Sequence, residues 1–386
     1  MATSEDPHVS NLTFDQLAAL LDSVFALKES EKWLTILVDL PDARVPDEPA
    51  WQDRRSIAGE WFRLLQQNRV RLPFSSVAYC VYPNVGSNNN DLPDAAVVAQ
   101  SHDAYSALPG GETLPFDVIL AASSVVLAPT QLSATAPLKL LAKIHGFRGA
   151  TLPGFSRDMI PVLALDYEQV NERVVEFKQR MDRADGIAVT LDAARARYAS
   201  SFDLRFRSGH ASGGLMREPG MVGNLPSGEA YIVPYEGELA AEPSRTTGEL
   251  PVQFGDEIVV YRLERNRAVE VLSSGPASEQ ERQRLAEEPA YGNIAEVGIG
   301  VLGEWGVQAV GSTLLDEKLG LHIAFGRSDH FGGVTSPASF RDPARVVHID
   351  RVYVPSTQPL VSVREAAFSY PDGARETIIE RGKYVV

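Results

Sequence analysis

Apolar residues in the first half of the chain follow two alternating patterns. Segments with a helical period of about 3.6 residues, at 14–27 and 54–68, alternate with short apolar runs at 33–40 and 76–82. The same patterns predict a buried strand at 116–127, a helix at 136–145 and a charged helix at 167–183. Helices and strands that alternate in this way are typical of βαβ units. We therefore predict an α/β fold that begins with an N-terminal α/β domain containing a mostly parallel sheet.

After about residue 185 the pattern changes to short strands with alternating polar and apolar residues, separated by glycine and proline. These strands are predicted at 187–191, 202–207, 230–234, 257–263, 269–272, 322–325 and 346–352. One helix is predicted among them, at 278–288. Such a pattern favours a mixed, β-rich domain. The expected organisation is an N-terminal domain over residues 1–185 and a C-terminal mixed β-rich domain over residues 186–386.

Charge and composition narrow the classes of function. The 386 residues contain 36 Lys and Arg against 51 Asp and Glu, for a formal net charge of −15, and 44% are hydrophobic. Affinity for nucleic acid depends on clustered cations that displace counterions from phosphates, and the chain has no run of Lys or Arg. We therefore expect a globular protein without a nucleic-acid partner.

The single cysteine, Cys80, excludes an intramolecular disulfide and any metal site built on several cysteines. It lies in an apolar strand, where an inert buried thiol is expected. Residues 1–11 are polar and acidic and lack the basic and apolar regions of a secretory signal. No apolar run approaches the roughly 20 residues that cross a bilayer. The sequence thus predicts a cytoplasmic protein without a membrane partner.

Candidate chemistry is concentrated in the second half of the chain. Three of the seven histidines, His322, His330 and His348, lie within a short stretch. In a strand, His348 and Asp350 would project from one face two residues apart, so both could bind one ion. An H-x-D triplet is also common as a surface pair, or as a core histidine bonded to a carboxylate.

Three other apolar segments each carry an ionisable residue, namely Glu229, Glu296 and His322. Because burial of a charged group without a partner is costly, each of these residues needs a partner in the fold. One such residue alone would usually be a hydrogen-bonded core group. Four strands of this kind, with the H-x-D triplet included, are more simply explained by a shared cation. Imidazole and carboxylate together suit zinc, cobalt or manganese.

Two other sequence features, a glycine motif and a histidine, are not interpreted as parts of a metal or cofactor site. Residues 298–303 match the G-x-G-x-x-G fingerprint of dinucleotide sites, but no amphipathic helix follows them, so the match is interpreted as turn chemistry. His210 lies in a Gly- and Ser-rich segment and is interpreted as a loop histidine that could contact a substrate.

Five ordered segments within residues 185–355 resemble the thermophilic metallo-aminopeptidase family, of the aminopeptidase S/T type. They are Gly223 to Glu229, Gly292 to Gly300, Leu315 to Lys318, His322 to Gly326 and His348 to Asp350. The resemblance implies a two-metal hydrolase whose ligands are Glu229, Glu296, His322, His348 and Asp350. Glu296 and Asp350 would lie between the ions, with Glu229 on one ion and both histidines on the other. Such a ligand set suits two divalent metal ions, zinc, cobalt or manganese, about 3.5–4 Å apart.

By the same resemblance, the ions activate water for attack on an N-terminal peptide bond or a small amide, with Glu296 as the general base. A homodimer would suit the family. The family pattern has a tyrosine seven residues after the first histidine, to hydrogen-bond the tetrahedral intermediate, whereas this chain has Asp329. The next residue, His330, is the expected substitute as a proton donor. The candidate catalytic residues are therefore Glu296, Asp329 and His330.

Two alternative functions remain. At the H-x-D triplet the chain also resembles dioxygenases that open dihydroxypyridine rings at a single Fe(II), held by two histidines and one carboxylate. Those enzymes carry histidine at the position of Glu296 and lack counterparts of Glu229 and His322, which favours hydrolysis here. The other alternative is a catalytically idle protein that only binds metal.

Overall fold

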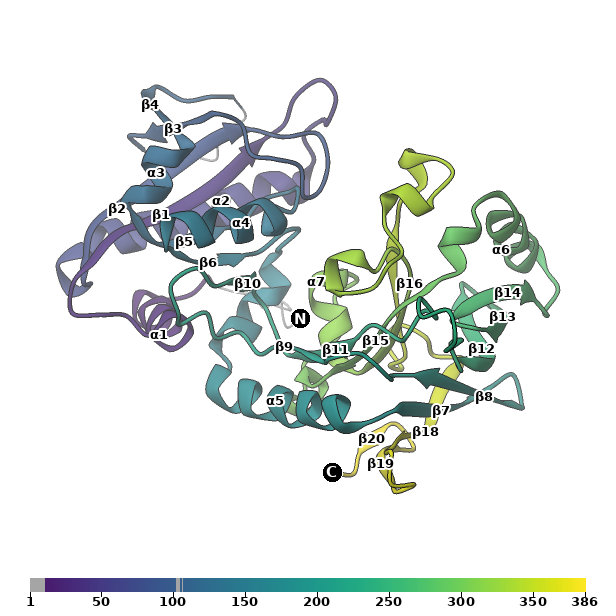
Figure 1. Ribbon diagram of the computed structural model, residues 1–386. Coiled ribbons are helices and arrows are strands. Elements are labelled where there is room, and N and C mark those ends of the chain that lie inside the picture. The colour runs from purple at the N-terminus through teal and green to yellow at the C-terminus, as the bar shows by residue number, and fades with distance from the viewer. Residues whose placement is uncertain (1–10, 102–104, 106) are drawn as a thin grey trace, which may run out of the picture. The chain divides into compact units, whose positions relative to one another are not determined.

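In the computed structural model, which describes residues 11–101, 105 and 107–386, the chain forms two compact units (Figure 1). The first unit comprises Met1–Asn171 and Gly214–Ser227, and the second comprises Glu172–Gly213 and Gly228–Val386. The first unit therefore includes a segment well beyond residue 185, where the sequence pattern changes. Residues 1–10, most of the acidic N-terminal segment, lie outside the described residues.

The first unit is built on a seven-stranded sheet with the strand order β10-β6-β5-β1-β2-β3-β4. The pairs that join β10, β6, β5, β1 and β2 are all parallel, whereas β3 and β4 extend the sheet as antiparallel strands. The predicted α/β architecture with a mostly parallel sheet is thus confirmed. The strands are β1 (Glu31–Leu40), β2 (Phe74–Pro83), β3 (Ala95–Ala99), β4 (Gly111–Pro115), β5 (Ser123–Ala128), β6 (Arg148–Thr151) and β10 (Val222–Asn224). The helices are α1 (Phe14–Phe25), α2 (Pro49–Gln67), α3 (Phe116–Ala122) and α4 (Thr135–His145), and α5 (Tyr167–Arg183) begins in this unit.

The predicted strand at 116–127 is wrong in its first half, which forms helix α3. Phe116, Ile119 and Leu120 are buried with the i, i+3, i+4 spacing of one helix face, while Val118 is 50% exposed. Only Ser123–Ala128 is extended, as β5, and it pairs with β1. A short apolar run does not by itself distinguish a strand from buried helical turns.

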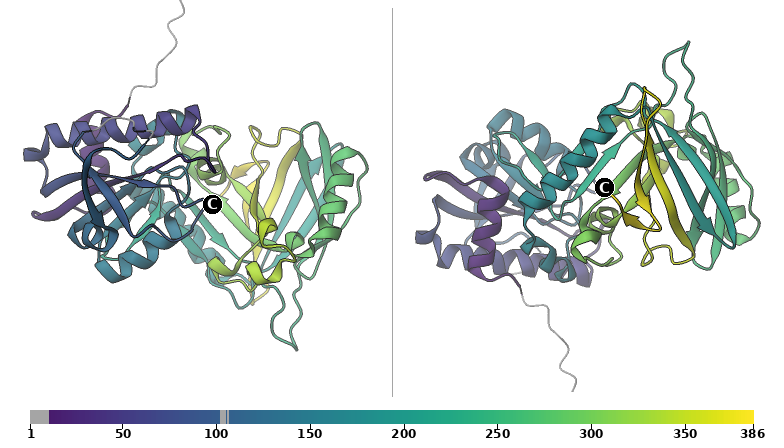
Figure 2. Two further views of the ribbon diagram at one scale, coloured as in Figure 1. Left: turned by 90° about the horizontal axis from the view of Figure 1, so that it is seen from above. Right: turned by 90° about the horizontal axis from the view of Figure 1, so that it is seen from below.

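The second unit contains two antiparallel sheets (Figure 2). The five-stranded sheet has the order β17-β16-β15-β11-β9, and the eight-stranded sheet has the order β14-β13-β12-β8-β7-β18-β19-β20. The predicted β-rich character is therefore confirmed. The strands of the five-stranded sheet are β9 (His210–Ser212), β11 (Glu229–Ile232), β15 (Ile294–Gly300), β16 (Leu321–Gly326) and β17 (His348–Val352). Those of the eight-stranded sheet are β7 (Gly186–Ala193), β8 (Ala196–Asp203), β12 (Thr247–Phe254), β13 (Glu257–Glu264), β14 (Arg267–Val271), β18 (Val361–Ser369), β19 (Arg375–Glu380) and β20 (Lys383–Tyr384), and the helices are α6 (Pro276–Glu287) and α7 (Thr313–Asp316).

The five-stranded sheet has an apolar face and a polar face. On β16, Ile323 and Phe325 alternate with His322 and Ala324, so the two pairs lie on opposite faces. The Phe325 ring centroid lies 5.2 Å from that of Tyr261 on β13, which places the apolar face toward the eight-stranded sheet. His322 consequently lies on the opposite face of the five-stranded sheet.

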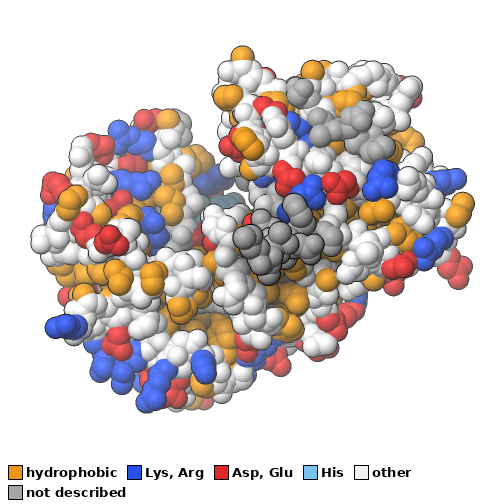
Figure 3. Space-filling model, turned by 180° about the vertical axis from the view of Figure 1, so that it is seen from behind, with side chains coloured by type: hydrophobic (Ala, Val, Ile, Leu, Met, Phe, Trp, Pro, Cys, Tyr) orange, Lys and Arg blue, Asp and Glu red, His pale blue; other side chains and the backbone are white. Residues whose placement is uncertain are grey.

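None of the described helices is both long enough and apolar enough to cross a membrane. On the face seen in Figure 3, Lys and Arg side chains are interspersed with Asp and Glu side chains.

A buried ion pair joins the start of β1 to β6 in the first unit. Arg148 Nη2 lies 2.5 Å from Glu31 Oε1, and both side chains are at most 5% exposed. Burial alone would raise the pKa of Glu31, but hydrogen bonds from the Lys28 backbone and from Arg148 lower it. We expect Glu31→Gln to destabilise the first unit by about 3–5 kcal/mol, because it leaves the Arg148 charge buried without a counter-ion.

The loss of stability caused by Glu31→Gln should depend on pH. A carboxyl group whose pKa is lowered by folding stabilises the fold above its unfolded pKa, and this stabilisation is lost as the pH falls through the folded value. In urea unfolding, the variant should therefore differ from the wild type at neutral pH and approach it at about pH 2. The exposed Glu29→Gln variant is the control, and an equal difference at both pH values would contradict a role for the Glu31 charge.

Candidate metal centre

The five residues predicted as metal ligands come from four adjacent strands of the five-stranded sheet. Glu229 lies on β11, Glu296 on β15, His322 on β16, and His348 and Asp350 on β17. These strands are hydrogen-bonded neighbours although the residues span more than a hundred positions of sequence. The structure therefore brings all five residues to one region of one sheet.

Strand register places these side chains on the same face. Ala324 pairs with Glu296 on one side and with Asp350 on the other, so these three residues form a row across the sheet. His322 lies two residues before Ala324 and pairs with Gly298. Because side chains two residues apart in a strand share a face, His322 projects on the same side as both carboxylates.

Glycine makes room for the His322 ring. A Cβ atom on Gly298 would lie 1.9 Å from His322 Nε2, so an alanine there would collide with the imidazole. Gly298 and Gly300 both belong to β15. Two glycines of the G-x-G-x-x-G match thus lie in a strand and not in the predicted turn, and Gly298 serves to accommodate a candidate ligand.

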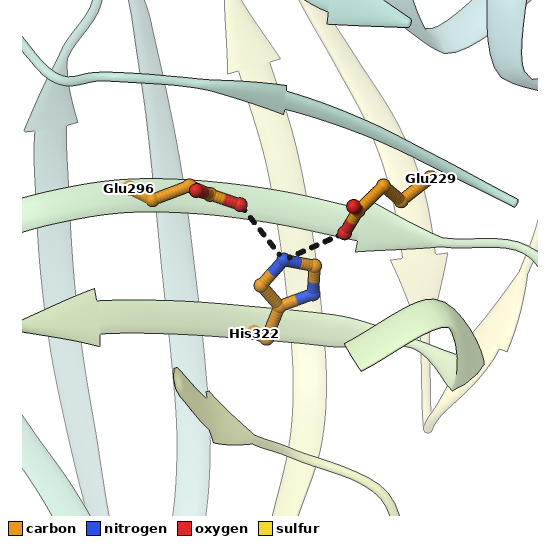
Figure 4. A group of neighbouring side chains, drawn as sticks. All are labelled: Glu229, Glu296 and His322. Atoms are coloured by element: carbon orange, nitrogen blue, oxygen red, sulfur yellow. Dashed lines mark hydrogen bonds and ion pairs between the residues drawn. The ribbon is translucent and has the colours of Figure 1, made fainter. Parts of the chain in front are cut away.

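The side chains form two groups that share Glu296. In the Glu229 group, His322 Nε2 lies 3.1 Å from Glu296 Oε1 and 3.3 Å from Glu229 Oε2 (Figure 4). In the Asp350 group, His348 Nε2 lies 3.5 Å from Glu296 Oε2 and 3.6 Å from Asp350 Oδ1. Each group therefore contains one histidine, whereas the family resemblance implies that both histidines bind the same ion. The two oxygens of Glu296 face different histidines.

Backbone carbonyl groups orient both imidazoles. His322 Nδ1 lies 3.2 Å from the carbonyl oxygen of Gly320, and His348 Nδ1 lies 2.8 Å from that of Arg327. With a proton on Nδ1, each ring donates to the carbonyl oxygen and turns the lone pair of Nε2 toward the carboxylates. This is the usual arrangement of a histidine that binds metal.

Two further charged residues of the centre, Glu317 and Lys318, are absent from the predicted ligand set. Lys318 is fully buried, and its Nζ donates a 2.7 Å hydrogen bond to Glu229 Oε1 and also contacts Glu317 Oε1. Burial, and the charges of Glu229 and Asp350, raise the pKa of Glu317 to about 8 against the opposing charge of Lys318. The sequence does contain one indication that these two residues matter: the segment Leu315 to Lys318 is part of the family resemblance, although the resemblance assigns no metal ligand to it.

Attraction between the carboxylates and the neighbouring lysine and histidine side chains shifts the pKa values within the centre. Burial alone would raise the pKa of Glu229, but Lys318 and His322 lower it to about 2. Burial is likewise outweighed at Glu296, where His322 and His348 lower the pKa. At His322, burial acts to lower the pKa, yet the attraction of the neighbouring Glu229 and Glu296 carboxylates raises it well above 6.5. The carboxylates thus draw positive charge into the centre, as protons on the imidazoles or as metal ions.

The residues of the centre fit a pair of divalent cations. The carboxylates of Glu229, Glu296 and Asp350 outnumber the single ammonium group of Lys318, which leaves an excess of negative charge. Glu229 Oε2 is buried and lies 3.3 Å from His322 Nε2, but it makes no hydrogen bond of good geometry among the described residues, as expected of an oxygen that binds a cation. Carboxylate oxygen and imidazole nitrogen are donors that zinc, cobalt and manganese accept.

Asp329 and His330, the other predicted catalytic residues, lie on a loop beside the centre. Asp329 forms an ion pair with Arg327, with Oδ1 and Nε 2.5 Å apart, and belongs to neither ligand group. The His330 ring centroid lies 5.3 Å from that of His348. Burial, together with the charges of His348 and Arg327, lowers the pKa of His330 to about 4. A neutral imidazole at neutral pH is a weak proton donor.

Glu236 fixes this loop and is absent from the sequence predictions. Its carboxylate is 4% exposed and accepts hydrogen bonds from Asn293 Nδ2 at 2.6 Å, Ser328 Oγ at 2.8 Å and Thr335 Oγ1 at 2.9 Å. Glu236 follows the short strand β11 in a loop, where no periodic pattern marks it as buried. The loop that carries Asp329 is therefore held by contacts that only the fold creates.

No protein-family model matches the chain, and no curated protein sequence matches it significantly. Among solved structures, the chain is similar to 2,5-dihydroxypyridine dioxygenase from Pseudomonas putida KT2440, with a TM-score of 0.58 and 14% identity over 97% of this chain and 98% of that one. It is also similar to wild-type AmpT from Thermus thermophilus, with a TM-score of 0.54 and 15% identity over 97% of this chain and 99% of that one. The chain shares its fold with both proteins along nearly its whole length.

Proposed function

We propose that this protein is a co-catalytic metallohydrolase that removes N-terminal residues from peptides or cleaves a related small amide. The observation that carries the proposal is the position of Glu296, whose two oxygens face two histidines in separate ligand groups. A carboxylate shared between two groups is the arrangement that holds two ions close together. The aminopeptidase resemblance and the shared fold with AmpT support the same function.

In the proposed mechanism, Glu229 and His322 would hold one cation, His348 and Asp350 would hold the other, and Glu296 would contribute to both groups. Two divalent cations would supply a polarised water and a Lewis acid for the amide carbonyl. Glu296 takes the proton from the attacking water and returns it to the leaving amine. A free α-amino group of the substrate, in its neutral form, would offer a nitrogen lone pair to one of the cations, which would restrict cleavage to the N-terminal residue.

The dioxygenase alternative has the same fold in its favour, but the ligand groups argue against it. A mononuclear iron oxygenase site uses two histidines and one carboxylate on one ion. Here each group contains one histidine and two carboxylates. The two functions therefore differ both in the ligands of each ion and in the number of metal ions per chain.

Metal analysis of the purified protein, coupled to a screen of aminoacyl amides and dipeptides, tests the proposal. We expect two zinc, cobalt or manganese ions per chain, turnover that a chelator abolishes, and recovery when metal is restored. A metal at a hundred times its Kd should also stabilise the fold by about 2.7 kcal/mol, seen as a rise in Tm. One iron per chain with oxygen-dependent ring opening, or no turnover with saturating metal, would refute the hydrolase.

His348→Ala and His145→Ala form a matched pair for this test. His348→Ala should lose metal and turnover because it removes a ligand of the Asp350 group. The His145 imidazole pairs with Asp117 in the first unit, 3.1 Å away, so His145→Ala should keep both. Equal metal content in the two variants would contradict the assignment of His348.

A further inference from the structure

Tyr231 lies beside the candidate metal centre and carries a hydroxyl group that the fold does not use. It follows Glu229 by two residues on β11, so both side chains project from the same face of the sheet. Tyr231 pairs with Gly298, which pairs in turn with His322, so the three residues form one row across adjacent strands. Because Gly298 has no side chain, β15 places nothing between the phenol and the imidazole. The Tyr231 hydroxyl makes no hydrogen bond with any described residue.

Neighbouring rings hold the Tyr231 ring in this position. The His210 imidazole stacks on it, with centroids 5.0 Å apart and an angle of 19° between the planes. Phe331 packs edge-on against the same ring at 4.9 Å, and its own ring lies 5.5 Å from that of His348. His210 Nε2 also lies 3.0 Å from the carbonyl oxygen of Phe331, which joins β9 to the loop. Tyr231 is thus held near both ligand groups. It shares a row of the sheet with His322 of the Glu229 group, and it packs on Phe331, which contacts His348 of the Asp350 group.

We propose that Tyr231 is a further catalytic residue, whose hydroxyl donates a hydrogen bond to the oxyanion of the tetrahedral intermediate. The inference rests on the proposed hydrolytic function. A donor that is held in place where negative charge develops stabilises the transition state without reorganisation. The Asp329 carboxylate is no substitute, because an ionised carboxylate only accepts hydrogen bonds and this one is paired with Arg327. β11 therefore supplies both a metal ligand and an oxyanion donor.

The experiment compares Tyr231→Phe with Tyr198→Phe, a control that removes a hydroxyl group from β8 in the other sheet of the same unit. Metal content, Tm, kcat and KM for aminoacyl amides, and the affinity for a tetrahedral aminophosphonate are measured for both variants and the wild type. We expect Tyr231→Phe to retain its metal, its Tm and its KM and to lose about 10²–10³ in kcat. Its affinity for the phosphonate should fall by at least about tenfold. Tyr198→Phe should match the wild type throughout.

The outcomes distinguish this inference from the proposed function. If the wild type is active and Tyr231→Phe keeps its kcat or its phosphonate affinity, the inference is wrong and the hydrolase proposal stands. A Tyr231→Phe variant that loses metal or melts at a clearly lower temperature would show that the residue supports the fold, which also overturns the inference. A wild-type protein without turnover on any amide would refute the proposed function, and the role of Tyr231 with it.

Discussion

Replacement of Glu296 by glutamine should reduce kcat by about 10⁴-fold or more, because the shared ligand and the proposed general base are lost together. Glu296 is the side chain common to both ligand groups, with Oε1 facing His322 and Oε2 facing His348. Glutamine keeps the shape of the side chain but replaces one oxygen by an NH2 group, which has no lone pair for a cation. Neither cation would then have its full set of ligands.

Metal content separates this effect from a general loss of structure. Glu296→Gln should bind fewer than two ions per chain and show a smaller metal-induced rise in Tm than the wild type. The control is Glu270→Gln on β14, where the carboxylate is 53% exposed and pairs with Arg262, and this variant should keep both ions and full turnover. Turnover by Glu296→Gln at the wild-type rate would refute the shared-ligand assignment.

The alternation of helical and extended patterns is enough to predict the α/β character of the first unit and the β-rich character of the second. The spacing of apolar residues along an element shows which of its faces is buried, and this spacing differs between helices and strands. The prediction of a strand at 33–40 corresponds to β1, Glu31–Leu40. β10 could not be predicted in this way. It has only three residues, Val222–Asn224, and it joins the parallel sheet beside β6 from a distant part of the sequence. So short a strand is defined by its partner and not by a pattern of its own.

The candidate ligands are recognisable in the sequence because each is an ionisable residue in an apolar strand, where burial demands a partner. Glu317 and Lys318 belong to a 3₁₀ turn before β16, and a charged turn of this kind is indistinguishable from a solvated one until the fold buries it. The division of the histidines between two groups is equally inaccessible to sequence. It depends on the register of β15 against β16, which shifts at a bulge between Ile294 and Glu296.

Substitution of Gly298 by alanine should disable the Glu229 group without altering any ligand. The backbone of Gly298 lies in a regular strand, so alanine is acceptable there except for its contact with the imidazole. The added Cβ would lie 1.9 Å from His322 Nε2 and 2.2 Å from Cε1, and the ring would have to move away from Glu229 and Glu296. A misplacement of about 1 Å near the reacting atoms can cost 10²-fold in rate, so we expect at least that loss in kcat.

Metal content is again the more specific measurement for Gly298→Ala. The variant should keep the ion of the Asp350 group, whose histidine is not displaced, and lose the ion of the Glu229 group, which leaves about one ion per chain. Gly110→Ala is the control, because a Cβ atom at Gly110 would meet no atom within 4 Å. If Gly298→Ala bound two ions and retained wild-type turnover, the position of His322 over Gly298 would not be its position in the working centre, and the pairing of His322 with Glu229 would have to be abandoned.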